Sequence, residues 1–479
     1  MAQREAVVVG GGFAGITAAL ALHDAGRHVT LFEREIDLGG RCGRQDHPNA
    51  DVDVGHHLLF RGCTTVLRTL GRLGLHSLIQ LQPSTSMFFA RTSDGTTATL
   101  RSGRLEAPNH LVGSMLAFPY LDLKDKVRLR RVVQAMRDLE EAEVHDLDTI
   151  SFGDWLRRFE QTTQSIESFW TPLVRAGLNV HTEHASAAQA ILLFQQTLFD
   201  DAQAYDAVTF VVPLSVAMRE MAARLVEAGI VVRSSVSVTG LHEDEAGWKV
   251  TTTDGAVHAH EVVLAIGAGA TRTMLRGMPD LSEPLACMSD LNSSPRVAIH
   301  LFYSAPRPSP WPPFAFVIDH AIIDLIVHRS TELAAPHEGH WISVLCNDAA
   351  RLGEAADEAL IQAAIEVVER LWPTEAPSEP ERSEVVRSME ATFAPRPGSV
   401  RMRQGLPVGR EGLAIAGDWT WTRWPSSIEG ACRSGLHAAA RLADASGGGS
   451  TAWDAWPAAP RRGDEGWPEW SVTPEDLRT

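Results

Sequence analysis

The sequence contains very few lysines and tyrosines. Only Lys124, Lys126 and Lys249 are lysine among 43 basic residues, and the chain has 3 tyrosines. A genome rich in G and C explains such a bias. The scarcity still limits any mechanism that depends on a catalytic lysine to three candidates.

Cysteine is also scarce, and no apolar run is long. The 5 cysteines form no CxxC pair, which excludes a regular disulfide framework and predicts no metal site. No charged leader with an apolar core opens the chain, and the most apolar stretch, 207–218, is interrupted by polar residues and proline. We therefore expect a cytoplasmic protein without a membrane span.

Size and charge narrow the class further. The chain has 479 residues, of which 44% are hydrophobic and 22% charged, so two or three folded domains are expected and bulk disorder is excluded. The formal net charge of -17 repels a phosphate backbone, so nucleic acid is not an expected partner.

One segment departs from this acidic average. Residues 124–137 contain six basic residues and one acidic residue, with Leu129, Val132, Val133 and Met136 at helical spacing. A basic amphipathic helix of this kind lies on anionic lipid or presents an ordinary solvated face to water. The sequence leaves both readings open, so a peripheral position on the inner face of the cell membrane is the alternative to a purely cytoplasmic one.

The chain opens with the pattern of a βαβ unit. An apolar strand is expected over 6–9, a helix over 16–25 and a second strand over 29–32. Further along, the segments with a clear pattern are the strands 230–238, 248–253, 261–265, 296–303, 314–318 and 341–346, a hairpin turn at Asp254-Gly255, helices between 110 and 205, and a helix over 357–371.

A glycine fingerprint lies inside the βαβ unit. Gly10, Gly12 and Gly15 form GxGxxG between the first strand and the helix, and Glu33 closes the second strand. This spacing permits a tight turn, a close approach of the backbone to a pyrophosphate and a carboxylate at the ribose. The sequence therefore predicts a dinucleotide site.

Two further segments resemble flavin-binding motifs. Gly39-Gly40-Arg41 is similar to the glycine-pair motif of the flavin amine oxidase and carotenoid desaturase superfamily, and 417–420 with 426–431 are similar to its second flavin motif. The resemblance implies that FAD is the cofactor. The residues expected to bind it are Gly10, Gly12, Phe13, Ala14, Gly15, Glu33, Arg34, Gly39, Gly40, Arg41, Gly55, His56, Val236, Gly267, Gly417, Asp418, Ser427 and Ile428.

The resemblance also implies an α/β architecture. A discontinuous Rossmann-type, glutathione-reductase-like FAD-binding domain is expected, with an inserted α+β substrate domain and a helical subdomain that faces a membrane in one reading. The expected division is 1–105, 208–284 and 396–444 for the FAD-binding parts, 106–207 for the helical insertion, 285–395 for the substrate-binding part and 445–479 for a flexible tail.

Other segments are more similar to one branch of the superfamily. These are 53–57, 169–173 with 177–179, 292–295 and 391–394, and they resemble the squalene-associated FAD-dependent desaturases known as hydroxysqualene dehydroxylases. Arg296 departs from this resemblance, because the family is usually apolar at that position. The shortage of lysine counts against amine oxidation.

This resemblance implies reductive removal of an allylic hydroxyl from a long apolar isoprenoid, with electrons from an unknown donor. His57 is the candidate proton donor, and Trp421 and Trp424 are candidates for shielding a cation. His56 and His57 could instead be structural, and the two tryptophans could simply wall an apolar pocket. Alternative functions are a desaturase or isomerase of a carotenoid or other natural product, and a flavin-binding scaffold without turnover.

Overall fold

The predicted βαβ unit is present. β1 (Glu5–Val9) pairs in parallel with β2 (His28–Phe32), and α1 (Phe13–Asp24) connects them. They belong to a six-stranded sheet in the order β18-β19-β12-β1-β2-β8. Its other strands are β8 (Val231–Arg233), β12 (Glu261–Leu264), β18 (Gly409–Arg410) and β19 (Leu413–Ile415).

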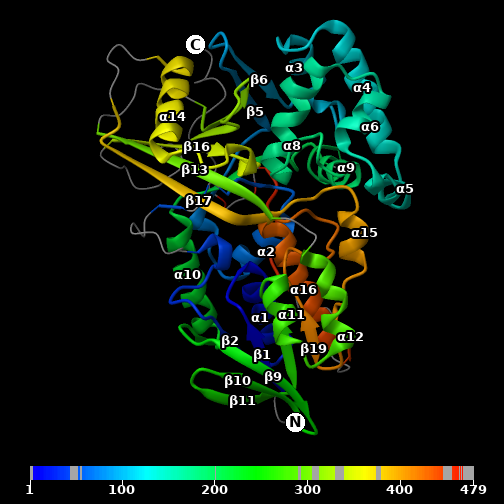
Figure 1. Ribbon diagram of the computed structural model, residues 1–479, viewed down its shortest axis with the longest axis vertical. Helices are drawn as coiled ribbons and strands as arrows, with labels where there is room; N and C mark the ends of the chain where they lie inside the picture. The colour runs from blue at the N-terminus through cyan, green and yellow to red at the C-terminus, as the bar shows by residue number, and fades with distance from the viewer. Residues whose placement is uncertain are drawn as a thin grey trace.

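This computed structural model describes residues 4–43, 52–53, 55, 57–199, 201–289, 293–304, 312–329, 339–373, 379–445, 456–462, 464 and 467. Two lobes follow each other along the longest axis of the molecule (Figure 1). We call the lobe that contains the six-stranded sheet the nucleotide lobe. The other lobe contains a seven-stranded sheet and most of the helices, and we call it the distal lobe.

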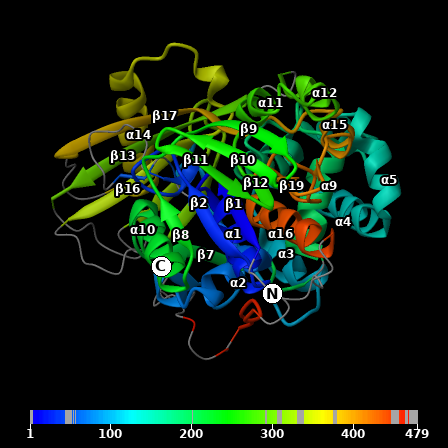
Figure 2. The same ribbon diagram turned by 90° about the horizontal axis from the view of Figure 1, so that it is seen from below.

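Both faces of the six-stranded sheet are covered, as its continuous apolar strands require. Val8 and Val263 pack with α1 and α16, whereas Val7 and Val262 pack with a small antiparallel sheet on the other face. Figure 2 shows the two layers on opposite sides of the sheet. The elements that complete this lobe are α16 (Ile428–Ala445), α2 (Thr64–Arg72), α10 (Leu214–Glu227), α11 (Ala268–Met274), α12 (Pro279–Ser282), β9 (Val238–Asp244), β10 (Gly247–Thr252) and β11 (Gly255–Ala259).

The hairpin expected at Asp254-Gly255 is confirmed, because β10 and β11 pair antiparallel with Thr252 opposite Gly255. A further three-stranded sheet has the order β3-β7-β4. Its strands are β3 (Leu59–Phe60), β4 (Ile79–Leu81) and β7 (Ala207–Phe210).

The distal lobe is built on a sheet in the order β17-β13-β16-β15-β14-β5-β6. Its strands are β5 (Ser86–Arg91), β6 (Thr97–Arg101), β13 (Ser293–Tyr303), β14 (Phe314–Ile318), β15 (Leu325–His328), β16 (His340–Cys346) and β17 (Arg382–Phe393). β5 pairs in parallel with β14, so the expected boundary at residue 105 is wrong: the chain leaves the nucleotide lobe before β5. Strand pairing across more than 200 residues leaves no local mark in the sequence.

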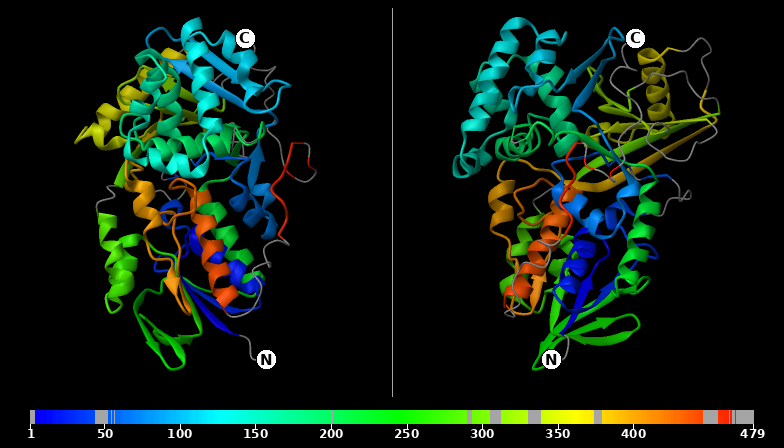
Figure 3. Two further views of the ribbon diagram at one scale, coloured as in Figure 1. Left: turned by 90° about the vertical axis from the view of Figure 1, so that its right-hand side faces the viewer. Right: turned by 180° about the vertical axis from the view of Figure 1, so that it is seen from behind.

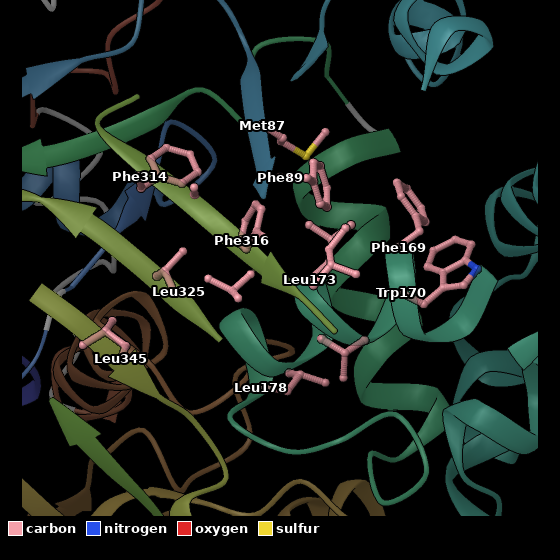
Figure 4. Packing of buried hydrophobic residues seen from close by; sticks show 14 of the residues in the cluster. Met87, Phe89, Phe169, Trp170, Leu173, Leu178, Phe314, Phe316, Leu325 and Leu345 are labelled. Carbon is pink, nitrogen blue, oxygen red and sulfur yellow. The ribbon is translucent and has the colours of Figure 1, made fainter. Parts of the chain in front are cut away.

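Helices dominate between residues 110 and 205, as expected. They are α3 (Val112–Ala117), α4 (Leu123–Asp138), α5 (Glu141–Asp146), α6 (Phe152–Arg158), α7 (Thr163–Ser165), α8 (Thr171–Leu178) and α9 (Ala187–Phe194), while α14 (Asp357–Leu371) and α15 (Ser399–Gln404) follow later in the chain. Figure 4 shows how these helices meet the sheet: Phe89 and Phe316 lie opposite Phe169 and Leu173 in one apolar core.

The apolar stripe of α4 faces this core and not the outside. Leu129, Val132 and Met136 are all buried, so the face that suggested lipid contact belongs to the interior of the distal lobe. Hydrophobic periodicity identifies a covered face but does not reveal what covers it. Within the described ranges, no helix combines the length and apolar character needed to cross a bilayer.

Part of the expected flexible tail is docked on the nucleotide lobe. Trp456 is 4% exposed and donates a hydrogen bond from its indole to Asp24 over 2.7 Å. Arg462 forms an ion pair with the fully buried Asp206, which also pairs with Arg61. Figure 3 shows the described C-terminal segment beside the residues around α2. The prediction of a flexible tail is therefore wrong for residues 456–462.

Candidate functional site

The glycine fingerprint forms a tight turn at the start of α1. A Cβ on Gly15 would lie 1.8 Å from the carbonyl oxygen of Gly10, so only glycine lets the helix approach the strand so closely. A Cβ on Gly12 would meet nothing within 4 Å, and no side chain caps α1. The N–H groups of the first helical turn therefore point toward a place that an anion can approach. Phe13 and Ala14 are buried within that turn.

Glu33 is held at the end of β2, next to this turn. One carboxylate oxygen accepts a hydrogen bond from the N–H of Gly11 over 2.7 Å, and the other accepts from the N–H of Glu35 over 2.9 Å. Val236 donates its N–H to the Glu33 carbonyl over 2.9 Å, so these two predicted residues lie together. The Arg34 side chain is largely exposed and pairs with Glu35.

The glycine pair packs directly on the fingerprint. The N–H of Gly39 donates to the carbonyl of Gly11 over 2.9 Å, and a Cβ on Gly40 would lie 3.4 Å from the Cα of Gly12. Gly39 has a φ of 132°, a conformation that other residues rarely adopt. The two motifs, separate in sequence, thus form one surface of bare backbone.

The second flavin motif closes the same place. Arg41 forms an ion pair with the buried carboxylate of Asp418, which raises the pKa of the arginine, and the hydroxyl of Ser426 donates to the same carboxylate. Ser427 precedes α16 and accepts the N–H of Gly430 over 3.1 Å, as an N-cap does. Ile428, the first residue of the helix, is buried.

Gly267 completes the arrangement. It precedes α11 at the end of β12, where a Cβ on Gly10 would lie 2.5 Å from the carbonyl oxygen of Ala265. Gly417 leads into the Asp418 turn and donates its N–H to the Ser434 hydroxyl over 2.9 Å. The glycine turn, the Glu33 carboxylate and the two helix N-termini are what a dinucleotide with a pyrophosphate requires, so the residues present fit FAD. His56 lies outside the described residues.

Two residues that the sequence did not single out hold this site in shape. Arg403 is 1% exposed, and burial lowers its pKa to about 10. It donates to four carbonyls of one loop, those of Asp418, Trp419, Thr420 and Trp424. A guanidinium that binds four carbonyls of one loop fixes the course of that loop.

The second of these residues is Glu429. Its fully buried carboxylate accepts the N–H groups of Thr65 and Val66 at the start of α2 over 3.0 Å each. Glu429 therefore ties α2 to α16. Its place within the second flavin motif was the only signal that could have indicated a role.

Trp421 and Trp424, expected together, pack in different cores. Trp421 is half-buried at the edge of the distal core and lies 5.4 Å from the Arg403 guanidinium. Trp424 is 4% exposed in the core of the nucleotide lobe, where Arg433 stacks on it at 4.4 Å. Trp421 alone faces the distal lobe, and its role stays a prediction.

Asn179 joins several of the segments that carried the family resemblance. It ends α8 in the left-handed region, with a φ of 56°, and its amide nitrogen donates to the Ser294 carbonyl over 2.8 Å and to the Thr392 hydroxyl over 3.2 Å. The Ser294 hydroxyl donates back to the Asn179 carbonyl. Segments 177–179, 293–295 and 391–394 therefore meet at one buried side chain, next to Ala391, whose carbonyl accepts from Arg41.

His57 lies among arginines. Burial, followed by the charges of Arg296, Arg329 and Arg41, lowers its pKa to about 3, and its Nε2 is buried without a hydrogen-bond partner. The ring is therefore neutral at ordinary pH. Its assignment as proton donor stays a prediction.

Comparison with known proteins identifies a matching family model and relatives of this chain. A family model described as flavin containing amine oxidoreductase matches residues 13–443. The hydroxysqualene dehydroxylase of Sinorhizobium fredii is 25% identical over 90% of this chain and 96% of its own length. The carotenoid phi-ring synthase of Streptomyces griseus is 26% identical over 93% of this chain and 89% of its own length.

Other relatives match only in part. The zeta-carotene desaturase of Zea mays is 30% identical over 40% of this chain, and the match spans 35% of that enzyme's length. Among solved structures, a putrescine oxidase variant aligns with a TM-score of 0.69 and 19% identity over 93% of this chain and 99% of its own. Cyclohexylamine oxidase of Brevibacterium oxydans aligns with a TM-score of 0.69 and 15% identity over 92% and 99%. These likenesses confirm the Rossmann-type fold.

Proposed function

The chain belongs to the family of flavin-containing amine oxidoreductases, and from that premise we propose that it is an FAD-dependent enzyme acting on a long isoprenoid. The leading reaction is the reductive dehydroxylation of hydroxysqualene to squalene. The observation that carries this proposal is the Asn179 junction, because it unites the segments that resemble this branch. The near full-length similarity to a hydroxysqualene dehydroxylase supports it.

A desaturase or isomerase of a carotenoid is the second candidate. It is favoured by the comparable similarity to a carotenoid phi-ring synthase over most of both chains. Both candidates share an apolar polyene or isoprenoid substrate, so the distal lobe has the same task in each. They differ in what happens to hydrogen: dehydroxylation adds it to the substrate, isomerisation moves it within the substrate, and desaturation removes it.

In this proposal the residues of the nucleotide lobe hold FAD, which supplies a hydride when it is bound and reduced. The N-termini of α1 and α16 would bind its anionic parts, and Glu33 would accept hydrogen bonds from a ribose. Arg403 keeps the Asp418 loop in place. The aromatic and aliphatic core of the distal lobe excludes water from the neighbourhood of the substrate.

The test is anaerobic product analysis. Chemically reduced, FAD-loaded protein is mixed with hydroxysqualene, and squalene is quantified in the extract. We expect squalene in proportion to the flavin that is oxidised. The same protein with oxidised flavin, given a carotenoid precursor, is the parallel reaction for the second candidate, and a desaturated or isomerised product in that arm alone would favour the alternative.

We further propose that the distal lobe touches an anionic membrane surface, from which an apolar substrate enters. Five of the exposed large apolar side chains gather between residues 105 and 127: Leu105, Val112, Leu116, Leu123 and Val127. The exposed basic side chains Lys124, Arg130 and Arg131 lie on α4, which also carries Leu123 and Val127. Apolar side chains flanked by cations fit an anionic lipid surface within a chain that is otherwise acidic.

Vesicle flotation tests this surface. Protein is mixed with phosphatidylcholine vesicles containing phosphatidylglycerol, and we expect flotation that weakens with salt. The double variant Leu116→Ser/Leu123→Ser should bind at least tenfold more weakly, because each leucine contributes about 1.5 to 3 kcal/mol on burial. Val226→Ser/Val408→Ser, which changes two exposed valines elsewhere, is the control. Equal flotation of both variants would contradict the proposal.

A further inference from the structure

Arg296 lies between the distal sheet and the loop that carries His57. It is on β13, two positions from Ala298 and four from His300, so these side chains share one face of the strand. The His300 Nε2 lies 3.0 Å from the Asp53 carbonyl, which shows that this face meets the loop. A Cβ on Gly55 would lie 3.7 Å from the Arg296 Cδ.

The position of Arg296 is fixed by the backbone before it. Asn179 holds Ser294 in two directions, and the register of β13 against β17 shifts between Ser294 and Arg296. The contacts of Asn179 with Ser294 therefore fix the backbone from which the Arg296 side chain extends.

Arg296 has no carboxylate partner among the described residues. Its Nε is buried without a hydrogen bond, and burial lowers its pKa. The nearby carboxylates are bound to other cations: Asp324 to Arg175 and Arg351, Asp53 to Arg329, and Asp418 to Arg41. A half-buried cation whose Nε is fully buried, and which has no ion pair with a described carboxylate, is costly, so it is expected where negative charge arrives during function.

The groups around Arg296 do not supply an uncompensated positive charge. His57 is neutral at ordinary pH, and Arg329 and Arg41 are neutralised by their own partners. Arg296 therefore supplies the uncompensated positive charge between the flavin-binding residues and the distal core, within the part of the chain that the structure describes.

We propose that Arg296 is a catalytic residue that binds the oxygen of the substrate's hydroxyl group and compensates the negative charge that develops there. This inference rests on the proposed function. The carbon–oxygen bond breaks and its electron pair leaves with the oxygen. A hydride from the reduced flavin forms the new carbon–hydrogen bond, and a proton from solvent converts the leaving hydroxide into water. The substrate gains two electrons and the flavin loses two.

Ligand preference tests the proposal without turnover. The probes are farnesoic acid, whose carboxylate mimics the charged oxygen, and farnesol, whose hydroxyl is neutral. Binding to FAD-loaded, oxidised protein is measured by quenching of tryptophan fluorescence. We expect the wild-type protein to bind the acid at least tenfold more tightly than the alcohol.

The variants separate charge from structure. Arg296→Gln should lose the preference for the acid and Arg296→Lys should keep part of it, while Arg276→Gln, an exposed arginine of the nucleotide lobe, should behave as wild type. FAD content and thermal unfolding show whether each variant is folded. If Arg296→Gln is not folded, the ligand preference of Arg296→Lys decides the test. In turnover of hydroxysqualene, Arg296→Gln should lower kcat far more than it changes KM.

Three results would overturn the proposal. The first is a wild-type protein that does not prefer the acid, and the second is an Arg296→Gln variant that still prefers it. The third is a shift of the flavin midpoint potential with unchanged ligand preference, which would assign the charge to the flavin. Failure to convert hydroxysqualene, with the preference lost in Arg296→Gln, would instead overturn the proposed function and leave the oxygen-binding role of Arg296 in place.

Discussion

Replacing Asn179 should destabilise the junction of α8, β13 and β17 in the distal lobe more than its single side chain suggests. Asn179 is 1% exposed, its amide group donates to the Ser294 carbonyl, and its Oδ1 accepts the N–H of Asp348 over 2.9 Å. In Asn179→Ala both backbone groups lose this partner. Because the Asp348 N–H is only partly buried, each group left unsatisfied is taken at about 1 to 2 kcal/mol, so the loss is about 2 to 4 kcal/mol.

The backbone adds a second term. Asn179 has a φ of 56°, a region that asparagine tolerates and alanine disfavours. This adds about 1 kcal/mol, so the free energy of unfolding of Asn179→Ala should fall by about 3 to 5 kcal/mol. Asn179→Gly, which removes the side chain without the backbone strain, should lose about 1 kcal/mol less.

Urea unfolding followed by tryptophan fluorescence measures these differences. Asn179→Asp is the matched variant, because it keeps the Oδ1 acceptor but loses the donor to Ser294. The ligand preference assigned to Arg296 should also weaken in all three variants, since Ser294 fixes the backbone before it. A loss of less than about 1 kcal/mol in Asn179→Ala, with the preference intact, would refute the role of the junction.

Three further predictions concern other parts of the molecule. The pKa of His57 falls from 6.5 to about 3 on folding, so between these pH values the unfolded chain binds a proton that the native protein does not, and stability falls as pH falls. His57→Asn should remove up to about 1.4 kcal/mol per pH unit of that slope in acid denaturation, and an unchanged slope would contradict the burial of a neutral ring. Arg462→Ala should lower the free energy of unfolding by about 2 to 3 kcal/mol and expose Trp456 to quenchers, because Asp206 is fully buried; unchanged quenching would show that the ion pair does not dock the tail. Glu429→Gln should cost about 1 to 2 kcal/mol and release FAD more readily, as measured by equilibrium dialysis, and unaltered FAD retention would separate α2 from the flavin site.

Local patterns predicted much of the fold. The helix expected over 357–371 coincides with α14, and the strand expected over 314–318 coincides with β14. The glycine fingerprint predicted the turn before α1, because a close approach of backbone to backbone demands glycine at fixed spacing. These features depend on residues within a few positions of one another.

Features that depend on distant residues could not be predicted in this way. Arg403 binds four carbonyls of a loop that lies 15 to 21 residues away, and Asn179 binds residues more than 100 positions away. The docking of Trp456 beside Asp24 likewise requires the folded nucleotide lobe. In the sequence, Arg296 stood out only because the family that the chain resembles is usually apolar at that position. Its proposed role depends on the residues that surround it in the folded protein.

In the proposed function, this protein delivers a hydride to the carbon that loses a hydroxyl group. The most direct measurement is a single turnover in D₂O, in which the protein is reduced, mixed anaerobically with hydroxysqualene and the product examined by mass spectrometry. We expect squalene that carries one deuterium for each flavin oxidised. Squalene without deuterium, or a desaturated or isomerised product in its place, would contradict the proposed function.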